Sequence, residues 1–118
     1  MYGLPKNIDL AFLLEKSLQQ VCVGFNDLIL QFDDDLGITI TSECDYESKR
    51  DEVTRIEKYP LSASMICQLL GCSIVQAKGA EDGTLVLRFS NEDTLTIYDD
   101  SKEYESYQIK HREHLIIV

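Results

Sequence analysis

The sequence is poor in basic residues and has no long apolar segment. It contains 11 Lys and Arg against 21 Asp and Glu, which gives a net charge of −10. Nucleic acids and anionic lipids are bound by clustered Lys and Arg, so this charge argues against both and suits a basic protein partner. No stretch approaches the ~20 apolar residues of a transmembrane helix. The first 16 residues also lack the basic leader of a signal peptide. We therefore expect a cytoplasmic protein that does not bind membranes.

Motifs of metal sites and of common enzymes are also lacking. The four cysteines (Cys22, Cys44, Cys67 and Cys72) form no C-x-x-C pair, although a zinc site needs two close ligand pairs. They are expected to be reduced thiols that pack as small hydrophobic side chains. There is no Gly-rich phosphate loop, no G-x-S-x-G and no H-E-x-x-H. The sequence therefore predicts no catalytic residue, no metal site, no cofactor and no enzyme activity.

An internal repeat is the main positive feature. Residues 28–40, LILQFDDDLGITI, recur 57 positions later as LVLRFSNEDTLTI at 85–97. Residues 13–20 match 69–76 one residue out of step, and Asp45–Ser48 matches Glu103–Ser106 at an offset of 58. Such a repeat indicates one supersecondary unit used twice around a shared core. We expect a single domain over 1–118, with halves at about 2–48 and 59–106 and a final strand at 114–118, because each half alone is too small to fold.

Hydrophobic periodicity predicts two short helices, over 9–16 and from Ser62 to about Leu70, with Gly71 as the C-cap of the second. Strands are expected at 18–24, 28–32, 38–43, 73–77, 84–90, 94–98, 104–110 and 114–118. The highly charged segment 45–58 is either a long loop or a strand pair with a solvated face. The sum is an α+β fold: a duplicated α-β-β-β(-β) unit whose mainly antiparallel sheet is curved or split and carries both helices. The expected core residues are Leu28, Leu30, Phe32, Leu85, Leu87 and Phe89.

Four segments carry a family resemblance: Y-G-L-P-x-x-I-D-L-x-F-L at the start, Q-V-C-V-G at 20–24, F-D-D-D at 32–35 and D-D-S-x-x-Y-E-S-Y-x-I at 99–109. Together they resemble a family of small uncharacterised bacterial proteins, defined as a domain of unknown function. The resemblance spans essentially the whole chain. It implies a bacterial, cytosolic protein, and it supplies no catalytic or binding residue.

Three groups of residues are candidates for a metal site or a catalytic site. Asp33, Asp34 and Asp35, with Asp99 and Asp100, could offer oxygen ligands to Ca²⁺ or Mg²⁺. A solvated turn is preferred, because consecutive residues of an extended chain point in opposite directions. His111 and His114 flank a predicted turn and are expected to be solvated. Cys72 as a nucleophile is disfavoured, because a helix C-terminus raises a thiol pKa.

Tyrosines among acidic residues are the best candidate for a binding surface. The expected partner-binding residues are Glu43, Asp45, Tyr46, Glu47, Tyr98, Asp99, Asp100 and Tyr104. Tyrosine is enriched at binding hot spots, and negative charge steers association with a basic protein. The alternatives are that these tyrosines pack inward as strand residues, or that the patch is a homodimer surface.

The sequence thus favours a non-catalytic acidic protein-interaction module, such as an immunity-type or accessory protein. The alternative is a domain that binds a small ligand or a divalent cation in a cleft between the two halves. An enzyme would require a cleft that holds Cys72, one histidine and a carboxylate.

Overall fold

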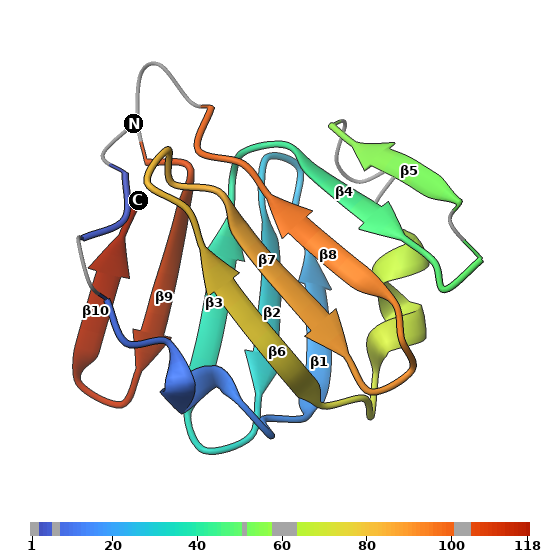
Figure 1. The fold of residues 1–118 in the computed structure, drawn as a ribbon, viewed down its shortest axis with the longest axis horizontal. Helices are drawn as coiled ribbons and strands as arrows, with labels where there is room; N and C mark the ends of the chain where they lie inside the picture. The colour runs from blue at the N-terminus through green and yellow to red at the C-terminus, as the bar shows by residue number, and fades with distance from the viewer. Residues whose placement is uncertain (1–2, 6–7, 51, 58–63, 101–104) are drawn as a thin grey trace.

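The computed structural model describes residues 3–5, 8–50, 52–57, 64–100 and 105–118 of the chain. These residues form two five-stranded antiparallel sheets, one in front of the other in Figure 1. The first sheet has the strand order β1-β2-β3-β9-β10, and the second has the order β5-β4-β8-β7-β6. The strands are β1 (Leu18–Val23), β2 (Leu28–Phe32), β3 (Leu36–Ile40), β4 (Cys44–Glu47), β5 (Val53–Ile56), β6 (Ile74–Gly79), β7 (Leu85–Phe89), β8 (Thr94–Ile97), β9 (Tyr107–His111) and β10 (His114–Ile117). The described helices are two short 3-10 helices, η1 (Ala11–Leu13) and η2 (Ser64–Leu69).

The expected α+β fold is wrong, because neither predicted α-helix forms. In the first segment Asp9 accepts the Ala11 N–H at 2.9 Å, as a helix cap would, but the helix has one turn. Leu14 then becomes extended and Glu15 takes a positive φ of 67°, so the helical path cannot continue. Gly71 has a φ of 83° at the equivalent place after η2. The expected start of the second helix, Ser62, lies outside the described residues.

The two halves of the chain exchange hairpins. Strands β1, β2 and β3 form a meander in the first sheet, but the hairpin β4–β5 that follows pairs with β8 in the second sheet. Strands β6, β7 and β8 form a meander in the second sheet, and the hairpin β9–β10 pairs with β3 in the first. Each sheet is therefore built from both halves. The segment 45–58 contains the strand pair rather than only a long loop.

A pseudo-two-fold axis passes between Ser17 and Ser73, which form an isolated antiparallel bridge. The N–H of Leu18 donates to the carbonyl of Cys72, and that of Ile74 donates to the carbonyl of Lys16, both at 2.9 Å. Gly71 donates to Leu18 and Glu15 donates to Ile74, both at 2.8 Å. In each of these two pairs of bonds, the donor and acceptor of one bond are 56 residues from the donor and acceptor of the other. The sequence repeat has the same offset of 56 in this region. The sequence repeat is therefore a two-fold relation in space.

The repeat at an offset of 58 has no such counterpart. β4 holds in the second sheet the place that β9 holds in the first, since Cys44 lies opposite Ile97 and Tyr107 lies opposite Ile40. Ile40 and Ile97 are equivalent residues of the repeat, so Cys44 corresponds to Tyr107. Glu47 and Ser48 are therefore not spatially equivalent to Glu105 and Ser106, and Glu103 and Tyr104 of the same match lie outside the described residues.

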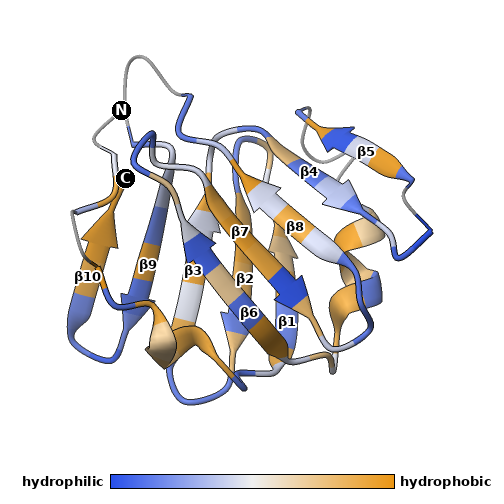
Figure 2. Cartoon of the chain, viewed as in Figure 1, coloured by the Kyte–Doolittle hydropathy of each residue, from blue (hydrophilic) through white to orange (hydrophobic). Residues whose placement is uncertain are grey.

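The core lies between the two sheets and takes alternate residues of the central strands. All six residues expected there are buried, none with more than 5% of its surface exposed, which confirms that prediction. The rings of Phe32 and Phe89 stack across the pseudo-two-fold axis with 6.4 Å between centroids. Figure 2 shows hydrophobic segments interrupted by hydrophilic ones along the strands, and mostly hydrophilic residues at the turns. The C-terminal segment is only partly buried: Val118 is inside, but Leu115 and Ile117 are exposed.

Candidate functional site

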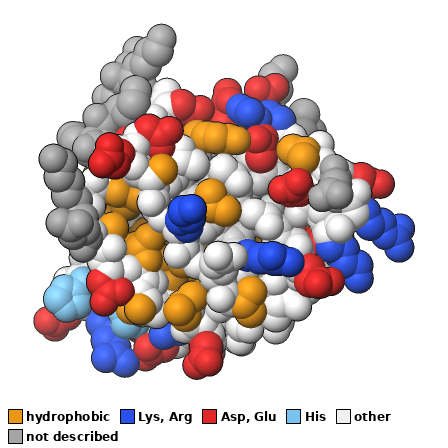
Figure 3. All heavy atoms as spheres, viewed as in Figure 1, with side chains coloured by type: hydrophobic (Ala, Val, Ile, Leu, Met, Phe, Trp, Pro, Cys, Tyr) orange, Lys and Arg blue, Asp and Glu red, His pale blue; other side chains and the backbone are white. Residues whose placement is uncertain are grey.

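Five of the predicted partner-binding residues lie around β4 and the end of β8, at the outer surface of the second sheet. We call Glu43, Asp45, Glu47, Tyr98 and Asp100 the acid–Tyr face. Alternate side chains of a strand point to opposite faces, so these acids face outward while Cys44 and Tyr46 face the core. Figure 3 shows this side of the molecule, where acidic and basic side chains lie next to hydrophobic ones.

Arg55 of β5 organises the acid–Tyr face. Its Nη1 donates to Glu43 Oε2 at 2.6 Å, and its Nε donates to Asp45 Oδ1 at 2.6 Å. The Tyr98 hydroxyl donates to Asp45 Oδ2 at 2.6 Å, and the Arg55 guanidinium lies 5.0 Å from the Tyr98 ring centroid. The Arg55 and Glu43 side chains are 46% and 41% exposed, so this network is held at the surface. A cation over an aromatic face adds to its order.

The pKa shifts here reflect the concentration of carboxylates. Hydrogen bonds to Glu43, and then to Asp45, raise the pKa of Arg55. The hydrogen bond to Asp45, and then burial, raises the pKa of the Tyr98 hydroxyl. Burial raises the pKa of Asp100, and the nearby Glu43 carboxylate adds to the shift. One guanidinium is set against four carboxylates, so the acid–Tyr face has a net charge of −3.

Arg55 was missed by sequence reasoning. In the charged segment 45–58 the composition singles out the aliphatic residues Val53 and Ile56, and it does not single out Arg55. The usable signal is the alternation in Val53–Ile56, where Val53 and Arg55 face solvent and Ile56 faces the core. Once the strand pair is chosen, its register places Arg55 directly opposite Asp45.

Tyr46 is not at this surface. Its side chain is buried, and its hydroxyl donates to Asp93 Oδ2. Asp93 is buried too and also accepts the Lys49 N–H at 2.9 Å and Asn91 Nδ2 at 3.1 Å. Burial, and then the Asp93 hydrogen bond, raises the pKa of Tyr46. This pair ties β4 to the β7–β8 turn.

Asp99 is also inside the molecule. Its Oδ2 accepts the Gly3 N–H and its Oδ1 accepts the Ser106 hydroxyl, each at 2.8 Å. Tyr107 is buried beside it and donates to the carbonyl of Gly83 at 2.6 Å. Asp99 therefore links the segment after β8 to Gly3 and Ser106, and Tyr107 links β9 of the first sheet to the β6–β7 turn of the second. Tyr104, the last of the predicted set, lies outside the described residues.

The three aspartates at 33–35 point to different partners. Asp33 Oδ1 accepts the Ser17 N–H at 3.0 Å, and the Asp35 carbonyl accepts the Arg112 N–H at 3.1 Å. The Asp34 carboxylate instead contacts three basic side chains. Asp34 and Asp35 both have a positive φ of about 55°. In the part of the chain that the structure describes, no three His, Cys, Asp or Glu residues come together to hold a metal ion.

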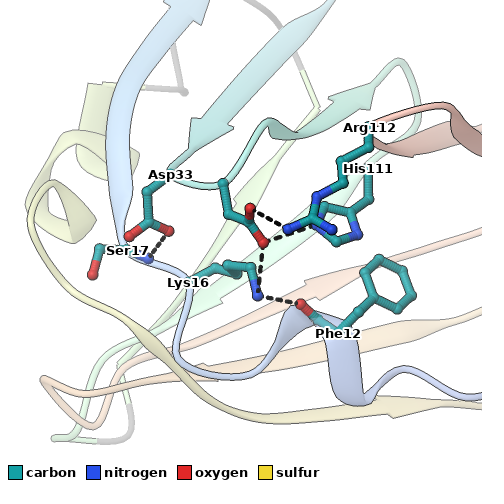
Figure 4. Close-up of polar contacts among 7 residues, drawn as sticks. Phe12, Lys16, Ser17, Asp33, His111 and Arg112 are labelled. Carbon is teal, nitrogen blue, oxygen red and sulfur yellow. Dashed lines mark hydrogen bonds and ion pairs between the residues drawn. The ribbon is translucent and has the colours of Figure 1, made fainter.

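Asp34 is the centre of a second charged cluster, which joins β9 to the β2–β3 turn and to η1 (Figure 4). Its carboxylate contacts Arg112 Nη2 at 2.8 Å, His111 Nε2 at 3.1 Å and Lys16 Nζ at 3.6 Å. Lys16 also donates to the Phe12 carbonyl at 2.8 Å. The Arg112 hydrogen bond, followed by that of His111, lowers the pKa of Asp34 to about 2.

An apolar groove adjoins this cluster. The His111 ring stacks on Phe12 with 5.2 Å between centroids. The groove has a volume of about 380 Å³ and is lined by Ile8, Phe12, His111, His114, Leu115 and Ile116. Residues of the first half and of the β9–β10 hairpin thus share one concave surface, and the two histidines line it together.

Cys72 and His111 contact different groups. The Cys72 thiol contacts the Gln68 carbonyl at 3.9 Å, whereas His111 bonds to Asp34. Cys22, Cys67 and Cys72 are free thiols. No helix in the described ranges is long and apolar enough to cross a membrane.

The chain is thus an antiparallel two-sheet β domain made of two pseudo-symmetric halves that exchange hairpins, with an ordered acidic network on one face. It belongs to the family of unknown function DUF6188, whose family model matches residues 11–118. No curated protein and no solved structure matches the chain. The resemblance to a domain of unknown function is thereby confirmed.

Proposed function

We propose that the protein is a non-catalytic interaction module that holds a basic protein through the acid–Tyr face. The observation that carries the proposal is the network of Arg55 with Glu43, Asp45 and Tyr98 on an exposed sheet surface. Side chains that are already ordered lose little conformational entropy when a partner binds. Tyr and Arg are also the residue types most enriched at binding hot spots.

Charge supports a basic partner. The acid–Tyr face keeps a net charge of −3 after Arg55 is counted, within a chain of net charge −10, while Lys78 and Arg88 lie toward the β6–β7 side of the same sheet. Such a field raises the rate of association with a cationic surface. The role would be that of an immunity-type or accessory protein of a bacterial cytoplasm, and the free thiols suit a reducing compartment.

The test is affinity capture from native lysate with a matched pair of variants. Glu43→Gln/Glu47→Gln/Asp100→Asn removes three charges from the acid–Tyr face, and Glu15→Gln/Glu81→Gln/Glu113→Gln removes three from exposed turns elsewhere. Both variants have a net charge of −7. We expect one basic protein to be captured at low salt by the wild type and by the turn variant, and at least about tenfold less by the face variant.

Two results would contradict the proposal. One is a low-salt eluate without a partner. The other is equal capture by both triple variants, which would mean that overall charge rather than the acid–Tyr face retains the protein. Salt supplies a further check, because a charge-steered complex weakens as ionic strength rises.

The groove beside Phe12 favours a second candidate function, the binding of a small apolar ligand. Concave, mainly apolar surfaces with a few polar groups are typical of ligand sites, and His111 and His114 supply the polar groups here. We expect a bound ligand to raise Tm in a screen of small apolar and aromatic acids. The same compound should shift Ile116→Ala less than the wild type. The absence of a Tm shift with every compound would count against this candidate.

A further inference from the structure

The two sheets have pseudo-symmetric outer faces that differ greatly in their number of charged residues. Directly opposed residues of neighbouring strands lie on the same face, so the strand registers define two rows of outward residues on each sheet. On the first sheet the rows are Ile117, Gln108, Thr39, Ile29, Cys22 and Leu115, Lys110, Gly37, Gln31, Gln20. We call these ten residues the neutral face. Lys110 is its single charged residue.

The equivalent rows of the second sheet serve as an internal comparison. They are Arg55, Asp45, Thr96, Val86, Lys78 and Val53, Glu47, Thr94, Arg88, Gln76. Five of these ten residues are charged. The same backbone positions carry Cys22 against Lys78, Gln31 against Arg88 and Gln108 against Asp45. The fold itself therefore does not require the neutral face to lack charge.

We propose that the neutral face is the contact between two copies of this chain. Its chemistry fits a copy of itself. Glutamine amides and threonine hydroxyls both donate and accept hydrogen bonds, so they can pair across a two-fold axis with the same residue types. Ile29, Leu115 and Ile117 supply apolar area, and Leu115 and Ile117 are 52% and 42% exposed. Interface cores are depleted in charge, as this face is.

The distribution of charge favours a second copy of the chain over a basic protein as the partner of the neutral face. The neutral face has no carboxylate in its rows, and Lys110 would repel a cationic partner. Two copies of net charge −10 repel each other where their acids meet, and this face keeps the contacting surface free of acids. Glu105 lies at the margin, where Gln108 Nε2 donates to its carboxylate at 2.9 Å. The acid–Tyr face, on the opposite sheet, stays free in such a dimer.

The size of the neutral face sets the expected affinity. Ten outward residues, at ~4.8 Å between strands and ~6.6 Å between alternate residues along a strand, cover roughly 320 Å² of flat area on each copy. Stable interfaces bury about 800 Å² per partner, so the dimer should be weak and should dissociate on dilution.

Sedimentation velocity of the full chain tests the proposal. From about 10 µM to about 1 mM, we expect the weight-average sedimentation coefficient to rise from the monomer toward the dimer value. Leu115→Glu/Ile117→Glu should remain monomeric throughout. The control Val53→Glu/Val75→Glu alters side chains that are 58% and 53% exposed, away from the neutral face, and reaches the same net charge of −12. It should dimerise as the wild type does.

The dependence of dimer formation on salt concentration is an independent test of the proposal. Added salt should leave the association unchanged or strengthen it, because salt screens the repulsion between the two acidic copies. If the Leu115/Ile117 variant does not fold, Gln20→Glu/Gln31→Glu tests the same face at two exposed residues. A wild type that is monomeric over the whole concentration range overturns the proposal. So does a control variant that loses association as fully as the neutral-face variants.

Discussion

At the residue scale, Glu15 and Gly71 show how one backbone geometry is served by different side chains. Both follow a 3-10 helix, both have a positive φ, and both donate their N–H across the pseudo-two-fold axis. Left-handed backbone costs an L-residue about 1–2 kcal/mol, whereas glycine adopts it freely. The first half of the chain therefore carries strain that the second half avoids.

We expect Glu15→Gly to leave stability unchanged or to raise it by up to about 1 kcal/mol, because relief of strain is partly offset by the entropy of glycine in the unfolded chain. Gly71→Ala should cost about 1 kcal/mol, since a Cβ there meets no atom within 4 Å and only the positive φ opposes it. Urea unfolding measures both. A loss of more than 1 kcal/mol in Glu15→Gly would show that the Glu15 side chain has a structural role.

A second difference in sequence between the halves leaves the local structure unchanged. Asp33 Oδ1 accepts the Ser17 N–H at 3.0 Å, and Ser90 Oγ accepts the Ser73 N–H at 3.1 Å. Carboxylate and hydroxyl thus perform the same bond at equivalent positions. Asp35 and Glu92 are both acidic, so the chemical difference that remains between residues 33–35 and 90–92 is Asp34 against Asn91.

At the scale of elements, each meander turn holds the hairpin that arrives from the other half. Asp34 in the β2–β3 turn binds His111 and Arg112 at the end of β9. Asp93, at the β7–β8 turn, binds the Tyr46 hydroxyl and the Lys49 N–H at the end of β4. One carboxylate at each turn therefore fixes one exchanged hairpin. Asp34 does this at the surface with ion pairs, and Asp93 does it in the interior with hydrogen bonds.

The Asp34 contacts predict a dependence of stability on pH. The pKa of Asp34 in the folded state, about 2, lies below its ordinary value of 3.8. Ionised Asp34 therefore stabilises the folded state above pH 3.8, and this contribution disappears as the pH falls toward 2. We expect Asp34→Asn to lower Tm at about pH 6, and the difference from the wild type to shrink steadily as the pH falls from 3.8 through about 2.

Asp35→Asn is the matched control for this prediction, because it removes one charge from the adjacent residue, which has the same backbone conformation. Its effect on Tm at about pH 6 should be the smaller of the two. If both variants lower Tm equally at every pH, the ion pairs of Asp34 do not stabilise the fold. Thermal unfolding followed by circular dichroism is sufficient for the measurement.

At the scale of the whole molecule, the exchange of hairpins makes each sheet depend on both halves. β4–β5 can pair with β8 only when the second meander is folded, and β9–β10 can pair with β3 only when the first is. A half alone would also expose the apolar inner face of its meander, at a cost of about 25 cal/mol per Å². One domain over 1–118 remains our prediction, and this mutual dependence supports it.

We therefore expect thermal unfolding to be a single two-state transition. In differential scanning calorimetry the calorimetric and van't Hoff enthalpies should agree for the monomer at low concentration. Phe89→Ala, which removes a buried ring of the central stack, should cost about 3–5 kcal/mol and move the whole transition without splitting it. Two separate transitions would mean that the halves unfold independently.

Much of the local structure could be predicted because it depends on local alternation. Leu28, Leu30 and Phe32 alternate with more exposed residues, and this pattern alone placed β2 and its copy β7. The helices could not be placed in this way. A short apolar stripe such as Leu10, Leu13 and Leu14 fits one 3-10 turn as well as an α-helix, and the hydrogen bonds across the pseudo-two-fold axis decided between them.

The proposed binding surface could be predicted only in part from the sequence, for the same reason. The acidic and aromatic composition singled out Asp45 and Tyr98. Arg55, which bonds to Asp45 and lies over the Tyr98 ring, comes from a strand whose pairing is non-local. Tyr46 and Asp99 belong to the same composition, yet the pleat and the connection after β8 turn them inward. The neutral face could not be seen at all without the strand registers, because its rows draw residues from five strands.

The sequence by itself determined the duplicated strands, their inward residues and the acidic character of the chain, since alternation and charge are properties of short segments. Only the tertiary structure decided that the halves exchange hairpins, that the repeat at an offset of 58 has no spatial counterpart, and that one sheet face is charged while its twin is neutral. The physical reason is that strand pairing and burial depend on contacts between residues far apart in the chain, and a local pattern allows several such pairings.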